Sequence, residues 1–265
     1  MAEDSIGAPK ALAESAVLIC GGTAGVGLAA AHQFAAAGVR RLALVGRNVE
    51  RGEAARKAVA DRAASTSVAF IAADTNDVAQ ARRACAAAFA ALGGIDVLVN
   101  TTAASYVPKL LFRTEVEDIA PILLAQALGP MLMSRLVLPG MRERKSGVII
   151  NVASDAAKVP TPGETIIGAA MAAIVTFTRT LAIEAKRDGI RANVLTPSLI
   201  GNTDVYTRLM SDPFSAKLFA NAARLASLGV TQPEDLAALM VFLASPAAGR
   251  LTGQAISVNG GISAA

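Results

Sequence analysis

Residues 16–27 read AVLICGGTAGVG, and this stretch decides the fold of the chain. Its first five residues are apolar, which predicts a buried β-strand. Glycines at positions 21, 22, 25 and 27 follow, and an Ala-rich run typical of a helix begins directly after them. A glycine turn between a strand and a helix lets phosphate oxygens approach backbone N–H groups at the helix N-terminus. The stretch therefore predicts a nucleotide-binding strand–turn–helix unit.

Apolar runs of strand length alternate with Ala-rich helical segments along the rest of the chain. Strands are predicted at Ala16–Cys20, Arg41–Val45, Val68–Ala72, Asp96–Val99, Val148–Val152, Ala192–Leu195 and Ala255–Val258. Strands that are apolar throughout and joined by helices indicate a parallel sheet with helices on both faces. We expect a single α/β domain over residues 15–265, Rossmann-type and doubly wound, with a seven-stranded, mostly parallel sheet.

Two segments depart from this alternation. Residues 1–14 carry no such pattern, and we expect a loose N-terminal leader. Residues 200–229 interrupt the rhythm with Asn202, Asp212 and Pro213, which predicts a helical lid over a substrate site.

The composition indicates a folded domain and argues against nucleic-acid binding. Of 265 residues, 53% are hydrophobic and 17% charged, whereas disordered chains are poor in apolar residues. The net charge is only +4, and 4% aromatic residues supply few stacking platforms for bases. We therefore expect a small-molecule ligand and no nucleic-acid partner.

Neither a metal site nor a membrane span is expected. Cys20 and Cys85 are isolated and lack metal-ligand or redox spacing, which indicates buried free thiols. The uncharged run Ile119–Ser134 is short for a membrane span and contains Pro121 and Pro130, so a buried or interfacial helix is expected. No signal-peptide pattern opens the sequence, and we expect a cytoplasmic protein.

Several motifs resemble those of the short-chain dehydrogenase/reductase family, across nearly the whole chain. The glycine turn fits the family's Gly-x3-Gly-x-Gly spacing, with Cys20 where Thr is common. The other matching segments are Asp74, Asn100-Thr101-Thr102-Ala103 in place of Asn-Asn-Ala-Gly, Pro197-Ser198 in place of Pro-Gly, Thr203, and the closing residues 251–254 and 258–261. The resemblance implies a nicotinamide cofactor and oxidoreductase activity.

The cofactor site is expected at the carboxyl ends of the strands. Its residues, by the glycine turn and the resemblance, are Gly21, Thr23, Gly25, Val26, Gly27, Arg47, Asn48, Asp74, Asn100 and Thr203. An NAD site places a carboxylate at the end of the second strand, but this chain has Arg47 there, which can pair with a 2′-phosphate. We expect NADP(H) in preference to NAD(H); a site that binds neither is the alternative.

The catalytic motif of the family is changed at three of four positions. In the family a Ser follows the fifth strand, a Tyr lies thirteen residues later, and a Lys lies four beyond it. Ser154 fits the first position, but Ile167 and Met171 occupy the other two, and Gln126 stands where the family has Asn. Ile167 cannot donate a proton, and a general acid is typically worth about 100- to 10,000-fold in rate. We expect ordinary carbonyl reduction to be absent.

Five other residues are candidates for the missing acid because of their position alone. Asp155, Lys158 and Glu164 flank the empty position, Tyr106 follows the fourth strand, and Tyr206 lies in the predicted lid. The single histidine, His32, lies on the first helix, away from the strand ends, and no catalytic role is expected for it.

Three readings of function stay open at this point. The chain is an oxidoreductase with a changed proton path, acting on an activated alkene or an iminium; a lyase, isomerase or hydrolase on the same scaffold; or a catalytically silent subunit or binding module. In the family, the helices around Gln126 and Met171 build a four-chain interface. The resemblance therefore implies a homotetramer or homodimer, or a hetero-oligomer with an active family member.

Overall fold

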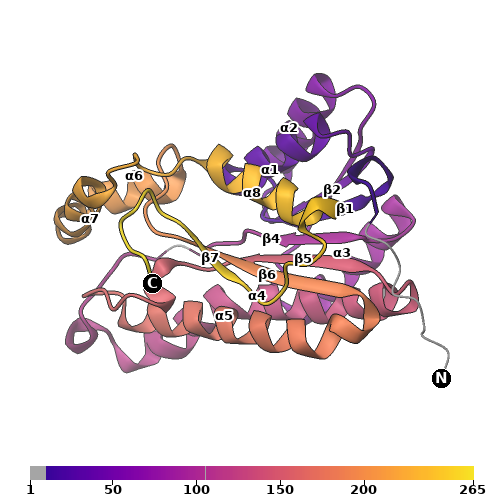
Figure 1. Ribbon diagram of the computed structural model, residues 1–265. Helices are drawn as coiled ribbons and strands as arrows, with labels where there is room; N and C mark the ends of the chain where they lie inside the picture. The colour runs from indigo at the N-terminus through magenta and orange to yellow at the C-terminus, as the bar shows by residue number, and fades with distance from the viewer. Residues whose placement is uncertain (1–9, 105) are drawn as a thin grey trace.

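The computed structural model describes residues 10–104 and 106–265, and seven strands among them form one parallel sheet (Figure 1). The strands are β1 (Ala16–Cys20), β2 (Arg41–Gly46), β3 (Ser67–Ala72), β4 (Val97–Asn100), β5 (Gly147–Val152), β6 (Ile190–Pro197) and β7 (Ala255–Val258). Their order is β3-β2-β1-β4-β5-β6-β7, and every pairing is parallel. The predicted sheet is confirmed, with each strand within two residues of its expected bounds.

Helices cover both faces of the sheet, as the apolar strands predict. On one face lie α1 (Gly25–Ala36), α2 (Val49–Arg62) and α8 (Pro233–Ala244), and on the other α3 (Val78–Leu92), α4 (Val116–Glu143) and α5 (Thr165–Ala185) (Figure 1). Because side chains alternate along a strand, Val17 and Ile19 of β1 pack toward the first set while Leu18 packs toward the second. The doubly wound α/β domain is therefore confirmed.

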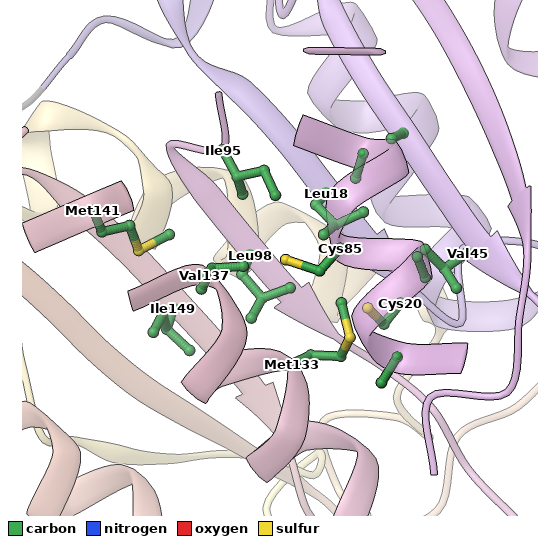
Figure 2. Packing of buried hydrophobic residues seen from close by; sticks show 14 of the residues in the cluster. Leu18, Cys20, Val45, Cys85, Ile95, Leu98, Met133, Val137, Met141 and Ile149 are labelled. Carbon is green, nitrogen blue, oxygen red and sulfur yellow. The ribbon is translucent and has the colours of Figure 1, made fainter. Parts of the chain in front are cut away.

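Both cysteines lie in the core between the sheet and the second set of helices. Figure 2 shows Cys20 of β1 and Cys85 of α3 among apolar side chains, with Met133 of α4 nearby. Both thiols are free, as expected, and burial raises the pKa of each. A thiol with a raised pKa carries little thiolate, so these two cysteines serve packing.

Two helices of the second face keep apolar surface exposed. By length and composition α4 and α5 would each suffice to cross a membrane, but only 39% and 44% of their most apolar segments are buried in the chain. The predicted apolar run Ile119–Ser134 lies within α4. The two helices pack against each other on the sheet, which leaves their outer sides to solvent or to another subunit.

Short 3-10 helices and two further α-helices complete the chain. The 3-10 helices are η1 (Leu12–Glu14), η2 (Leu111–Arg113), η3 (Asp155–Ala157), η4 (Lys186–Asp188) and η5 (Pro246–Ala248). Of the predicted loose leader, residues 1–9 lie outside the described residues. Residues 10–14 are packed on the domain instead: Lys10 pairs with Asp96 at 2.8 Å, and Arg41 donates to the carbonyl of Glu14 at 2.9 Å.

The segment 200–229 leaves the sheet after β6 and returns close to its starting point. It contains α6 (Asp204–Ser211) and α7 (Pro213–Leu225). Ile200 forms an isolated parallel bridge with Thr231, and the Gly201 N–H donates to the Thr231 carbonyl at 2.8 Å. The Leu228 N–H donates to the carbonyl of Gly260 at 3.0 Å. Both ends of the segment are thus fixed to the domain.

Candidate functional site

A cavity of about 800 Å³ lies at the carboxyl ends of the strands. We call its two parts the nucleotide end and the substrate end. The nucleotide end is lined by Gly21, Thr23, Ala24, Gly25, Val26, Arg47, Arg51, Asp74 and Thr203, and the substrate end by Tyr106, Gln126, Ser154, Glu164, Ile167 and Met171. Ligands of open parallel sheets bind at this edge, where strand order reverses about β1 and β4.

The nucleotide end is built mainly from backbone. Gly21 and Gly25 have φ angles of +82° and +48°, which a residue with a side chain rarely adopts. A Cβ on Gly27 would overlap the carbonyl of Gly21 and lie 2.5 Å from the hydroxyl of Thr101. The turn therefore depends on glycine for its shape.

The first turn of α1 offers unpaired N–H groups to the cavity. Among the described residues, no side chain caps this helix, whose N-cap is Ala24. By contrast, Asn48 caps α2 and Asp77 caps α3, each by accepting a backbone N–H. The orphan donors of a helix N-terminus, together with its dipole, favour a phosphate. The nucleotide end thus fits the phosphates of a nicotinamide dinucleotide.

Charged side chains lie at the far side of the nucleotide end. Arg47, directly after β2, has a largely exposed side chain, and its Nη1 lies 3.9 Å from a carboxylate oxygen of Asp74. Arg51 on α2 lies 3.9 Å from Asp204 at the start of α6. These pairs are long and solvent-exposed, so each is weak and its arginine is available to another anion. Thr203 lies beside the glycine turn, because its Cγ2 would be 3.6 Å from a Cβ added to Gly25.

Three of the predicted cofactor residues lie outside the cavity lining. The Asn48 side chain accepts the N–H of Arg51 at 2.7 Å and so serves as a helix cap. Asn100 is buried and donates to Asn151 at 2.8 Å, linking β4 to β5. Gly27 supports the turn from behind. The Asn48 oxygen and the Asn100 Nδ2 are therefore engaged with the protein, whereas the Asn100 Oδ1 is buried without a hydrogen-bond partner within the described part of the chain.

The substrate end contains the four residues that the sequence assigns to the catalytic motif, Gln126, Ser154, Ile167 and Met171. The Ser154 hydroxyl accepts the Ala156 N–H at 3.2 Å and so begins η3. Met171 is buried in a small apolar cluster that includes Ile174, Val194 and the half-buried Ile167. The amide of buried Gln126 lies 3.4 Å from both the N–H and the carbonyl of Ala104. Ser154 therefore places a hydroxyl group at the substrate end, which Ile167 and Met171 also line with apolar side chains.

Two of the five candidate acids are held by other groups. Asp155 is buried and accepts hydrogen bonds from Asn259 and, at 2.8 Å, from Ser263. Lys158 lies 3.7 Å from Asp155 and donates to Ser257. The carboxylate of Asp155 therefore anchors the segment after β7, and Lys158 lies outside the cavity lining.

The other three candidates line the cavity. The Tyr106 hydroxyl donates to the carbonyl of Gly163 at 2.8 Å, and burial raises its pKa, which makes it a poorer acid. Tyr206 lies on α6. Burial also raises the pKa of Glu164, to about 7. A carboxyl group with a pKa near neutral pH can both donate and accept a proton there, as general acid–base catalysis requires. Of the five, Glu164 has the chemistry best suited to the cavity.

His32 lies on α1 outside the cavity lining, and burial lowers its pKa. Two residues of the segment after β7, by contrast, lie in the lining. The sequence reasoning missed Ile262 and Ser263, which line the cavity through the network on Asp155. The closing motif of the resemblance, residues 258–261, ends immediately before Ile262. It is the sequence signal from which these two lining residues could have been predicted.

Comparisons with known proteins agree with this architecture. A family model described as enoyl-(acyl carrier protein) reductase matches residues 21–263. A Xanthobacter autotrophicus protein named "Inactive 2-(S)-hydroxypropyl-CoM dehydrogenase 2" is 35% identical over 227 residues, covering 84% of this chain and 95% of that protein. A 3-oxoacyl-[acyl-carrier-protein] reductase of Synechocystis is 31% identical, covering 95% and 98%. The crystal structure of levodione reductase superposes with a TM-score of 0.87 at 28% identity, covering 93% and 96%.

Proposed function

This chain belongs to the short-chain dehydrogenase/reductase family, and on that premise we propose that it is an NADP(H)-binding oxidoreductase with an altered substrate end. The observation that carries the proposal is the uncapped N-terminus of α1 at the nucleotide end, beside a glycine turn that admits a phosphate. When bound, a nicotinamide cofactor supplies or accepts a hydride. The residues that would hold it are those of the glycine turn, Thr23, Arg47, Asp74 and Thr203.

The position of Arg47 supports a preference for NADP(H). It follows β2, where an NAD site needs a carboxylate, and its side chain is largely exposed at the rim of the cavity. A guanidinium forms bidentate, charge-assisted hydrogen bonds with a phosphate, each worth about 1.5–3 kcal/mol. Arg51, one turn into α2, would strengthen the same anion site.

Titration with NADPH and NADH tests the cofactor proposal. We expect NADPH to bind at least about tenfold more tightly than NADH, and Arg47→Ala to remove most of that difference while NADH binding stays unchanged. Arg62→Ala, at the other end of α2, is the matched control and should bind both cofactors as the parent chain does. Failure of both cofactors to bind at millimolar concentration would remove the oxidoreductase proposal.

The substrate end limits the reaction that we propose. Reduction of a carbonyl places negative charge on oxygen, and a proton must reach it as the hydride reaches carbon. Ile167 and Met171 offer neither a proton nor a charge at this wall. The Ser154 hydroxyl can orient a polar atom of the substrate. We therefore propose a hydride acceptor that needs no proton at oxygen, with α6 and α7 as the lid over it.

A catalytically silent subunit is the second candidate function. The relative from Xanthobacter autotrophicus carries the word "Inactive" in its name, and α4 and α5 keep apolar surface exposed. Such a subunit would pair through these helices with a copy of itself or with an active family member. Turnover by the chain alone supports the first proposal, whereas activity gained only on mixing with an active relative supports the second.

A further inference from the structure

Glu164 places a carboxyl group at the apolar substrate end of the cavity. It directly precedes α5 and lines the cavity together with Ile167 and Met171, three and seven residues further along. At 1.5 Å per residue, these three side chains extend over about 10 Å of one helix face. The carboxyl group therefore lies beside the apolar wall that stands in place of the family's Tyr and Lys.

Among the residues that the structure describes, no cation forms an ion pair with Glu164. The ion pairs of the cavity belong to other acids: Asp74 with Arg47, Asp204 with Arg51, and Asp155 with Lys158. Burial is the dominant influence on the pKa of Glu164, and the nearby Thr161 side chain, whose hydroxyl donates to the Val159 carbonyl at 3.1 Å, lowers it only in part. A poorly hydrated carboxylate without a counter-ion gains most from a cationic ligand.

The titratable groups around Glu164 come from four parts of the chain. From the loop after β4, Tyr106 directs its hydroxyl to Gly163, and Glu164 contributes to its raised pKa. From η3, Asp155 is engaged with Asn259 and Ser263. From the lid, Asp204, Tyr206 and Arg208 line the same cavity. On α5 itself, Met171 removes the ammonium group that would repel a cation.

We propose that Glu164 makes the substrate end a receptor for a cationic ligand, and that the hydride acceptor is a protonated imine. This inference rests on the proposed function for its redox step, but the cation site itself is independent of it. Two features of the chain then have one cause. A protonated imine needs no Tyr to donate a proton, and a Lys at position 171 would repel it.

The proposed step balances without an added acid. The C=N carbon of the iminium accepts a hydride from the bound reduced nicotinamide. The π-electron pair of the C=N bond would become the lone pair of a neutral amine nitrogen, with oxidised nicotinamide as the second product. Glu164 holds the positive charge before the step and accepts an N–H hydrogen bond after it. If the substrate arrives as a neutral imine, the protonated carboxyl group supplies the proton first.

The test compares a cation with a neutral molecule of similar shape. Cyclohexylammonium and cyclohexanol are titrated into the protein by calorimetry at about pH 8, with and without saturating NADPH, in the parent chain and in Glu164→Gln. We expect the ammonium probe to bind at least about tenfold more tightly than the alcohol, and the variant to lose this difference. Cyclohexanol and NADPH binding should be unchanged. Glu184→Gln, an exposed acid on the same helix, is the matched control.

Substitutions at Met171 and a measurement at lower pH provide two further tests of the cation site. Met171→Lys places a like charge in the cavity and should also weaken ammonium binding about tenfold, whereas Met171→Leu should not. At about pH 5.5, where Glu164 takes up a proton, the preference for the ammonium probe should shrink. Equal binding of the two probes by the parent chain, or a preference retained in Glu164→Gln, overturns the cation site.

Oxidation of NADPH tests the proposed reduction of the imine separately from the binding of the cation. NADPH oxidation with 2-methyl-1-pyrroline, a cyclic imine, should exceed that with cyclohexanone, and Glu164→Gln should reduce it. If NADPH fails to bind while the ammonium preference is present, the proposed function fails and the cation site stands. If NADPH binds but no imine is reduced although the ammonium binds, the protonated-imine assignment is overturned.

Discussion

The two ends of the cavity are built from different parts of the chain. The nucleotide end depends on backbone: positive φ angles at Gly21 and Gly25, and the uncapped N–H groups of α1. The substrate end depends on side chains, and there Ile167 and Met171 form an apolar wall with Glu164 beside it. A backbone site can stay intact while side chains nearby change the chemistry. On the proposed function, this difference explains how the nucleotide site can be kept while the proton donor is replaced.

The largest expected effect comes from giving the substrate end the groups it lacks. In Ile167→Tyr with Met171→Lys, a phenol and an ammonium group would enter the cavity next to Ser154. Reduction of simple ketones by NADPH should rise by about 100- to 10,000-fold, the typical worth of a general acid. Ile167→Phe with Met171→Leu is the matched control, because it keeps the bulk without the polar groups. Unchanged activity despite NADPH binding would mean that more than these two groups is missing.

The second-largest effect is expected on NADPH affinity when the glycine turn of the nucleotide end is disrupted. Gly27→Ala forces a Cβ against the carbonyl of Gly21, so the turn must open. We expect NADPH affinity to fall by more than about 100-fold, and stability to fall by about 1–3 kcal/mol from overpacking. Ala29→Gly on the same helix costs about 1 kcal/mol by propensity alone and should leave NADPH affinity unchanged. Calorimetric titration and thermal unfolding separate the two effects, and tight binding by Gly27→Ala would refute the steric argument.

A smaller effect tests how the substrate end is fixed to the segment after β7. Asp155→Ala leaves Asn259 and Ser263 without their buried acceptor. We expect a loss of about 2 kcal/mol in the free energy of unfolding, or roughly 4–8 °C in Tm. Asp188→Ala removes a surface carboxylate that Arg142 and Lys145 contact, and should lower Tm much less than Asp155→Ala does, because solvent screens these ion pairs. Equal losses in the two variants would show that burial of Asp155 contributes nothing.

The smallest effect is the pH dependence that Glu164 contributes. Its pKa of about 7 in the folded chain lies above the ordinary value, so folding favours its protonated form. The stability that this group contributes is present at low pH and is lost as pH rises from about 4.5 toward 7. The Tm of Glu164→Gln minus the Tm of the parent chain should therefore increase by about 2–5 °C as the pH rises from about 5 to about 8. A difference in Tm that is flat with pH would indicate a solvated Glu164.

The sequence was sufficient for the sheet and for the nucleotide end because both follow from local patterns. Apolar runs such as Ala16–Cys20 can only be buried strands in a parallel sheet, and a glycine turn after one of them has a fixed place at its edge. Asn48 shows where this reasoning ends: its position beside Arg47 suggested a ligand contact, but its side chain caps α2. Capping and ligand binding use the same polar residues, and spacing does not distinguish them.

The substrate end was less predictable because its residues meet only in three dimensions. Asp155, Lys158 and Glu164 were equivalent candidates by position, and the fold separates them through partners far along the chain. Asn259, 104 residues away, holds Asp155, whereas Glu164 has the local contact with Thr161. Burial, which raises the pKa of Glu164, likewise depends on how the chain packs in three dimensions and not on any single motif.

The bridge between Ile200 and Thr231 has a practical consequence for engineering. Because the segment 200–229 leaves and re-enters the domain at neighbouring points, it can be treated as a removable cassette. A cassette of different length or sequence from another family member can be grafted between these two anchor residues without changing the register of the sheet. Substrate range could then be exchanged between relatives as a unit, with Thr203 and Asp204 kept in the graft because both line the nucleotide end.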